Sequence, residues 1–269
     1  MLRENMLRTE VLKGMFRPRT HQWTTSITKV EPNSIETRGY PQQDLIGNIS
    51  FSQMVYLLLK EKFPLPREEK MLQAVMVSFC DHGVTPPSTQ AARVIASSGS
   101  SLNACLAGGI LAFGKNHAGA IELAMKMLQE GIKDTQDSTM KIEEIAKKIV
   151  ENFEYTQKKV PGFGHRYHQK DPRALKIFQL AEELDCNGKH LELIFQLQDI
   201  LQENKGIKAN IDGANAAVLS DLGFNWRFGI GIFMIGRLPG IIAHIYEELT
   251  QEKPFRKLFL MDENNVNYL

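Results

Sequence analysis

The sequence is poor in cysteine and nearly balanced in charge, and both features narrow the classes of protein it could belong to. Its 269 residues include only Cys80, Cys105 and Cys186, which lie far apart and form no CxxC pair. Separated cysteines in odd number predict free thiols in a reducing compartment, so we expect a cytoplasmic protein. The formal net charge of +1 gives no broad field that would favour nucleic acid or an anionic membrane as the main partner.

Membrane, secretory and several catalytic signatures are also missing from the sequence. We find no run close to the roughly 18 apolar residues that span a bilayer. The basic segment 1–22 lacks the apolar region of a secretory signal, and Glu4 and Glu10 argue against a transit peptide, so we interpret it as a short docking arm. There is no GxSxG elbow, no phosphate-binding P-loop and no GxGxxG after a strand. Apart from His165 and His168, the histidines lack the spacing of zinc ligands, so no metal is expected.

Helical periodicity dominates the chain from Phe51 onward. Apolar residues recur three and four positions apart, which predicts an all-α fold. Only 24–30 and 34–37 alternate like strands, and they predict at most one small hairpin near the N-terminus. The last helix could be divided near Pro239. Helices are expected at 51–62, 67–80, 88–97, 101–113, 118–129, 140–158, 172–184, 191–204, 213–223 and 227–251.

Five segments at the ends of predicted helices, or within one, carry residues that could do chemistry. They contain, in order, His82, His117, His165, Asp212 and Arg237. Each histidine alone is more often a surface or capping residue, and Asp212 alone would serve as a helix N-cap. Arg237 is harder to explain, because a charge in an apolar helical stretch normally requires a partner. That partner could be internal, or it could be a carboxylate of a ligand.

Together these segments resemble the citrate synthase superfamily. The motif VPGFGHR followed by DPRA is very specific, and IDGA after an asparagine and IGRxPG follow in the order of the family. DHGVTPPST and HAGA complete the set, so the resemblance covers roughly Thr24 to the C-terminus. It implies a two-lobed helical domain over 23–269. The large lobe would comprise about 23–118 and 212–269, and the small lobe about 119–211.

Within the superfamily, the sequence is most similar to stand-alone citryl-CoA lyases and to the C-terminal module of ATP-citrate lyase. The segments RGYPQQDLIG, DHGVTPPS and SLNACLAGGILAFG carry this finer resemblance. It implies cleavage of citryl-CoA to acetyl-CoA and oxaloacetate, with the coenzyme A thioester as substrate and no cofactor. Members of the superfamily are homodimers at minimum, so we expect a homodimer or larger homo-oligomer. A citryl-CoA synthetase is a partner that fits this activity.

The resemblance also assigns roles to the catalytic positions. His117 matches the histidine that hydrogen-bonds the thioester oxygen of the enol or enolate. His165 matches the histidine that acts on the oxaloacetate carbonyl or on the citryl hydroxyl. Asp212 matches the carboxylate that moves the methyl proton.

Binding positions are implied in the same way. His82, Arg173 and Arg237 match the groups that hold the carboxylates, and Arg256 is a candidate for the arginine that synthases borrow from the partner subunit. The expected coenzyme A site comprises Val160, Gly162, Phe163 and Gly164, with Lys205 and Lys208 near the phosphates.

Two other functions stay open. A short citrate or 2-methylcitrate synthase would use the same groups to condense an acyl-CoA with oxaloacetate, and would then hydrolyse the thioester. A non-catalytic subunit that binds acyl-CoA would not require His117, His165 or Asp212, yet all three are present. The preference for a lyase rests on the finer resemblance, because both enzymes share the carbon–carbon step.

Overall fold

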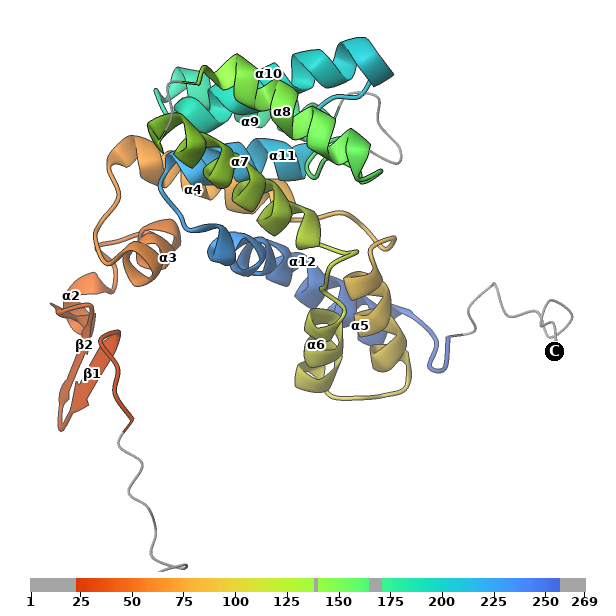
Figure 1. The fold of residues 1–269 in the computed structure, drawn as a ribbon. Coiled ribbons are helices and arrows are strands. Elements are labelled where there is room, and N and C mark those ends of the chain that lie inside the picture. The colour runs from red at the N-terminus through yellow and green to blue at the C-terminus, as the bar shows by residue number, and fades with distance from the viewer. Residues whose placement is uncertain (1–22, 138–139, 165–170, 257–269) are drawn as a thin grey trace, which may run out of the picture. The chain divides into compact units, whose positions relative to one another are not determined.

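The computed structural model describes residues 23–137, 140–164 and 171–256 (Figure 1). The chain divides into two compact units, Met1–Ser50 and Phe51–Leu269. Short strands occur in the first unit, whereas the described part of the second is built from helices. The predicted helical fold class with a small N-terminal β element is confirmed. The expected boundaries of the two lobes stay a prediction.

The first unit contains the predicted hairpin. β1 (Thr28–Glu31) pairs antiparallel with β2 (Ser34–Thr37). The turn between them contains Asn33 with a φ of +61°, a left-handed conformation that asparagine tolerates well. A third strand, β3 (Tyr40–Pro41), pairs with β2 and leads into α2 (Gln42–Leu45). The sequence did not predict β3, because two residues are too short to show an alternating pattern.

Each helix that the periodicity predicted is present in the second unit. Most ends lie within a few residues of their expected positions. In chain order the elements are α3 (Phe51–Lys60), α4 (Pro66–Phe79), α5 (Pro87–Ser97), α6 (Leu102–Leu111), α7 (Gly119–Asp137), α8 (Ile142–Tyr155), α9 (Pro172–Glu183), α10 (Lys189–Lys205), α11 (Ile211–Asp221), the 3-10 turn η1 (Trp226–Phe228) and α12 (Gly229–Gln251).

The largest difference concerns α7, which was expected to end at Gln129 and continues through Gly131 to Asp137. Glycine in a helix interior costs roughly 1 kcal/mol relative to alanine, so the sequence favoured an earlier end. The structure gives a packing reason for it. A Cβ at Gly131 would lie 3.1 Å from Leu193 of α10 and 3.2 Å from Ile149 of α8. The glycine lets three helices approach one another closely.

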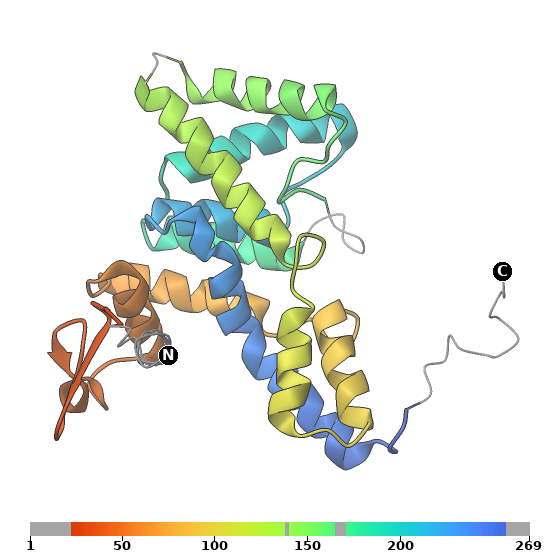
Figure 2. The same cartoon turned by 60° about the horizontal axis from the view of Figure 1, so that its bottom comes forward.

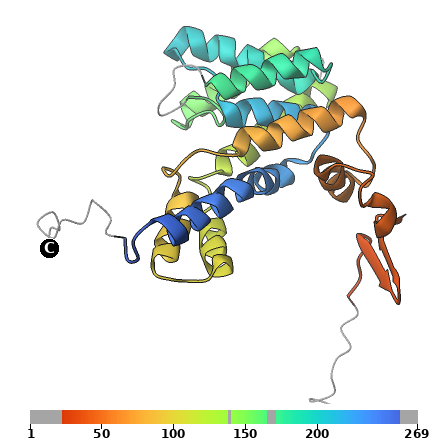
Figure 3. The same ribbon diagram turned by 180° about the vertical axis from the view of Figure 1, so that it is seen from behind.

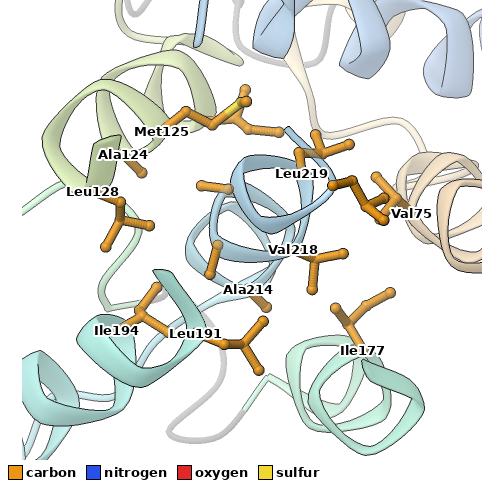
Figure 4. Packing of buried hydrophobic residues seen from close by; sticks show 14 of the residues in the cluster. Val75, Ala124, Met125, Leu128, Ile177, Leu191, Ile194, Ala214, Val218 and Leu219 are labelled. Carbon is orange, nitrogen blue, oxygen red and sulfur yellow. The ribbon is translucent and has the colours of Figure 1, made fainter. Parts of the chain in front are cut away.

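The main core surrounds α11. Residues 211–220 of this helix are buried except Asp212, which is half-buried. Figure 4 shows apolar side chains of α4, α7, α9 and α10 converging on α11 from several sides. The small residues of IDGANAA permit this, because neighbouring backbones can come close to α11 where side-chain volume is low. α11, which carries Asp212 in its first turn, is therefore fixed by packing around its whole circumference.

A second cluster joins α5 and α6 to the C-terminal half of α12, through Ala92, Cys105, Ile241 and their neighbours. Figure 2 shows the three helices lying together. Seen from behind, α4 lies between α12 and the helices around α11 (Figure 3). α12 is a single helix with Pro239 inside it, so the division considered near this proline does not occur.

α12 also corrects an expectation about apolar runs. Together with η1 it forms a segment, Trp226–Gln251, that is long and apolar enough by composition to cross a membrane. It is the one such helix in the described part of the chain. Core helices of folded proteins pass the same test, and 44% of its apolar window is buried inside the fold. The sequence search missed it because Arg237 and the glycines interrupt a strict apolar run.

Candidate active site

Several segments of the second unit, including the one that contains Gly164, converge on a cavity of about 350 Å³. The loop after α4, the turn before α7 and the first turns of α9 and α11 contribute to its wall, together with α12. Six residues that the sequence singled out line it. They are His82, His117, Gly164, Arg173, Asp212 and Arg237.

His117 lies in a tight turn before α7. Its backbone exchanges two hydrogen bonds with Gly114, at 2.8 and 3.0 Å, and Ala118 follows with a φ of +66°. The imidazole stacks on Phe113 with ring centroids 5.1 Å apart. Its Nε2 lies 2.8 Å from the hydroxyl of the buried Ser88. The ring is held on its face and at its edge, which fixes its direction in the cavity wall.

Asp171 fixes Arg173. The Asp171 carboxylate caps α9 by accepting from the Arg173 backbone N–H at 3.0 Å, and it also accepts from Nε and Nη2 of the same guanidinium at 3.1 and 2.9 Å. It further accepts from the Ile211 N–H at 3.2 Å. Burial would raise the pKa of Asp171, but Arg173 and the backbone donors outweigh it and hold that pKa below its usual range. One carboxylate thus ties Arg173 to the start of α11.

Asp212 stands in the first turn of α11. The cap of this helix is Asn210, whose side-chain oxygen accepts from the N–H groups of Asp212 and Gly213 at 3.0 and 3.2 Å. Asp212 is therefore not the capping residue, and it lines the cavity. Burial raises its pKa to about 6, although Arg173 and Arg237 both favour the charged form. Such a group exchanges a proton readily near neutral pH.

Arg237 has both an internal partner and a place in the cavity wall. It is 3% exposed, and its Nε donates to the Phe79 carbonyl at 2.6 Å. Its guanidinium carbon lies 4.9 Å from the centre of the Phe233 ring, a cation–π geometry. Burial lowers the pKa of Arg237. A guanidinium has five donors, so the bond to Phe79 leaves capacity for a ligand carboxylate.

His82 lies in the loop after α4, in the cavity wall. The residue before it, Asp81, turns this loop by accepting from the Gly83 N–H at 2.8 Å. The same carboxylate oxygen lies 2.8 Å from Nε2 of His244 on α12. A side chain of α12, the helix that also carries Arg237, therefore holds this loop in place.

A second cavity, of about 510 Å³, is lined by four of the residues expected to bind coenzyme A: Val160, Phe163, Gly164 and Lys205. Lys205 pairs with Glu154 at 2.9 Å. The rest of the wall is apolar except at two further lysines, Lys158 and Lys159. Gly164 lines both cavities, so they lie next to each other.

Backbone hydrogen bonds join the segment 162–164 to the approach to α11. Gly164 N–H donates to the Lys208 carbonyl at 2.9 Å, and Asn210 N–H donates to the Gly162 carbonyl at 2.9 Å. The Asn210 side chain donates to the Gly164 carbonyl at 2.6 Å. A Cβ at Gly162 would lie 2.6 Å from Cα of Gly213. Glycine is required here by close approach of two backbones.

Three described residues that were expected at the site, Gly162, Lys208 and Arg256, are not among the residues that line either cavity. His165 is outside the described residues. Lys208 contributes its main-chain carbonyl to the segment above. Arg256 follows α12, where its Nε and Nη2 each pair with a carboxylate at 2.7 Å, those of Glu248 and Glu252. That Arg256 contributes to the active site of a second subunit stays a prediction.

Sequence reasoning missed Ser88, Asp171 and Phe233 as parts of the site. Asp171 and Ser88 read as ordinary helix-start residues, and a helix start gives no sign of a second contact with a residue far along the chain. Phe233 reads as core. Among the described residues, no three His, Cys, Asp or Glu side chains form a group that could hold a metal ion.

The matches to known proteins agree with this geometry. The family described as citrate synthase, C-terminal domain, matches residues 64–258. The chain belongs to the citrate synthase family. A curated citrate synthase from Heyndrickxia coagulans is 33% identical over 80% of this chain and 56% of its own length. The chain thus spans about half the length of the curated relatives it matches.

Solved structures extend the comparison within the family. Citryl-CoA lyase from Hydrogenobacter thermophilus has a TM-score of 0.83 and 43% identity, over 92% of this chain and 94% of that one. ATP citrate lyase from Methanothrix soehngenii, in complex with citrate and coenzyme A, has a TM-score of 0.79 over 97% of this chain and 44% of that one. Its identity is 19%, so this second likeness concerns the fold.

Proposed function

We propose that the protein is a citryl-CoA lyase, which cleaves citryl-CoA to acetyl-CoA and oxaloacetate. The likeness to the Hydrogenobacter thermophilus lyase carries the proposal, because it covers nearly the whole of both chains at 43% identity. The cavity supports it with two arginines, two histidines and one carboxyl group of raised pKa. These groups suit a substrate with several carboxylates and a reaction that moves a proton to carbon.

In the proposed cleavage, a base removes the proton of the citryl hydroxyl while the carbon–carbon bond breaks. We assign this role to His165 from the family pattern. The electron pair of the broken bond moves into the thioester and forms an enol or enolate. Arg173 and Arg237 hold the carboxylates of the oxaloacetate half, because the guanidinium fork matches a carboxylate.

His117 donates a hydrogen bond to the thioester oxygen of the enolate. An oriented donor stabilises charge that develops during the reaction, and the loss of one such donor costs roughly 3–4 kcal/mol in other enzymes. The stacking on Phe113 and the bond to Ser88 support this role, since a donor must be in position before the charge appears. Ser88 then acts through His117.

Asp212 in its acid form protonates the methylene carbon of the enolate, which yields acetyl-CoA. In the reverse direction the carboxylate removes the same proton. A pKa of about 6 lets both forms be populated near neutral pH, which suits a group that must donate in one direction and accept in the other.

Coenzyme A is assigned to the second cavity. Its apolar walls and backbone groups would meet the adenine, and the lysines at 158, 159 and 205 would meet the phosphates. Gly164 lies where the two cavities join, so the thioester can extend from one into the other. A homodimer is part of the proposal. Its interface would use the exposed apolar side chains of α5, α6 and α12, which include Val94, Leu102, Leu111, Ile242, Tyr246 and Leu249.

The deciding experiment supplies citryl-CoA and follows oxaloacetate through its reduction by NADH. A lyase produces oxaloacetate and acetyl-CoA in equal amounts and releases no free coenzyme A. The citrate synthases among the relatives make a synthase the second candidate. Acetyl-CoA and oxaloacetate with a thiol reagent test it, because only a synthase hydrolyses the thioester. Steady release of free thiol, without oxaloacetate formation from citryl-CoA, would reject the lyase.

A further inference from the structure

A histidine outside the cavity is linked to the loop that carries His82. His244 lies on α12, and its Nε2 is 2.8 Å from Asp81 Oδ2. The same oxygen accepts from the Gly83 N–H at 2.8 Å. The side chains of His244 and Asp81 are 17% and 30% exposed. Asp81 and Gly83 flank His82, so the bond from α12 acts on the segment that sets where this imidazole stands.

The neighbours of His244 determine its tautomer. Nδ1 lies 3.3 Å from Nη1 of Arg93 on α5. A guanidinium donates hydrogen bonds and accepts none, and Glu247 Oε2, at 3.8 Å from Nδ1, lies beyond hydrogen-bond distance, so the contact with Arg93 makes Nδ1 the acceptor. The proton of the neutral ring is then on Nε2, where it donates to Asp81. The geometry therefore gives a chain of two hydrogen bonds, in which Arg93 donates to His244 and His244 donates to Asp81.

Arg93 is itself held in place. Its side chain is 9% exposed, and its Nε donates to the fully buried Glu248 carboxylate at 2.7 Å. Its Nη1 donates to Glu247, and its Nη2 lies 3.7 Å from Glu252. The hydrogen bond from Arg93, more than any other cause, lowers the pKa of Glu247. These carboxylates compensate the buried cation, so Arg93 is a fixed donor rather than a mobile surface charge.

α12 contacts the same loop at two further places. Arg237 donates to the Phe79 carbonyl, and a Cβ at Gly240 would lie 2.8 Å from Asp81 Oδ1. Arg237, Gly240 and His244 are spaced three and four positions apart, so they lie along one face of the helix. That face holds residues 79–83 in a fixed position relative to Arg237 in the cavity wall.

We propose that His244, as the neutral Nε2–H tautomer, is a positioning residue for carboxylate binding: it orients the Asp81–Gly83 turn so that His82 and Arg237 meet the oxaloacetate half of the substrate together. The inference rests on the proposed function. Nothing in it requires His244 to touch the substrate or to change its charge.

Calorimetry with oxaloacetate and, separately, with coenzyme A tests the role. His244→Ala should raise the Kd for oxaloacetate at least about tenfold, the effect of losing a hydrogen bond to a charged group. The Kd for coenzyme A should stay within about twofold of wild type, because its proposed cavity has other walls. His244→Gln should restore most of the affinity, since an amide can accept from Arg93 and donate to Asp81 without charge.

His190 offers a matched control. It lies on α10, its Nδ1 is 2.8 Å from Asp221, and its side chain is also 17% exposed. His190→Ala breaks a comparable histidine–aspartate bond at a residue that does not line the cavity. It should lower the melting temperature and leave the Kd for oxaloacetate unchanged. A general loss of stability therefore cannot imitate the expected result.

Asp81→Ala tests the same link from the loop, because it removes the acceptor of the His244 bond. It should weaken oxaloacetate binding by a similar factor, and the double variant with His244→Ala should be no weaker than either single one. An unchanged Kd in Asp81→Ala, additive effects in the double variant, or a Gln variant as weak as Ala would each overturn the proposal. If the wild type neither binds oxaloacetate nor cleaves citryl-CoA, the proposed function itself fails, and the inference fails with it.

Discussion

The two cavities share Gly164 but present charge in opposite ways. In the first, Arg237 is buried and Asp212 is half-buried, and loss of contact with water shifts the pKa values of both groups. In the second, the walls are apolar and the charge is on lysines such as Lys205, which is paired with Glu154 at a half-exposed position. Buried charges can direct chemistry because they are fixed and poorly screened, whereas exposed ones mainly attract and steer a ligand.

The largest expected effect comes from Asp212→Asn in the first cavity. Asparagine cannot exchange a proton with carbon, so the rate of citryl-CoA cleavage should fall at least about 100-fold, the lower range for a positioned acid or base. Coenzyme A affinity should change little, because the second cavity is unaltered. The check is kcat from the coupled assay together with a calorimetric Kd. Cleavage at the wild-type rate would remove Asp212 from the mechanism.

Gly213→Ala should damage both cavities at once. The new Cβ would lie 2.3 Å from the Gly162 carbonyl oxygen, and two backbones would have to move apart. We expect a loss of about 3 kcal/mol in the free energy of unfolding, at the upper end for overpacking, and weaker binding of oxaloacetate and coenzyme A alike.

Gly206→Ala is the control for that variant. Gly206 has a φ of +66° but open space around its Cα, so alanine should cost only about 1 kcal/mol of backbone strain. Urea unfolding of both variants gives the comparison. Equal losses would contradict the idea that the close contact between Gly213 and Gly162 makes glycine necessary at position 213.

The stability of the protein should depend on pH through Asp212. Its pKa rises from 3.8 to about 6 on folding, so the folded state resists ionisation that the unfolded chain undergoes. The contribution of this group is most favourable below about pH 4 and declines as the pH rises to about 6. The shift corresponds to at most roughly 3 kcal/mol. Asp212→Asn should therefore melt at a higher temperature than wild type at pH 7, with the difference vanishing near pH 4.

The smallest expected effect lies at the exposed pair of the second cavity. Glu154→Gln removes a carboxylate that competes with phosphate for Lys205. Exposed pairs contribute about 0–1 kcal/mol, so coenzyme A should bind only about two- to threefold more tightly. Oxaloacetate affinity should not change. The gain should shrink at high salt, and a gain that ignores salt would show that screening does not govern this cavity.

The helices and the candidate site residues could be predicted from the sequence for different reasons. The helices followed from apolar periodicity, and the candidate site residues followed from the motifs that contain them. Six of those residues line one cavity. The third strand and the end of α7 were missed, because two residues carry no period and because Gly131 looks unfavourable until its neighbours are known.

Partners across space were harder to predict than the residues themselves. Asp171 looked like a helix cap, and it is one, but it also holds Arg173 and the start of α11. The sequence analysis did not single out His244, and its tautomer depends on Arg93, 151 residues earlier. A local sequence pattern predicts the contacts that a side chain makes with residues close to it along the chain. Contacts with residues far away in the sequence depend on which segments the fold brings together.

The backbone joint between 162–164 and 208–210 has a consequence for how the two cavities affect each other. Since the same joint forms a wall of the coenzyme A cavity and the entry to α11, the occupant of that cavity and the proton on Asp212 share one thermodynamic cycle. Reciprocity then requires that any change in Asp212 acidity on coenzyme A binding appears as an equal change in coenzyme A affinity between low and high pH. Measuring the Kd for coenzyme A as a function of pH would give the coupling free energy between coenzyme A binding and the protonation of Asp212.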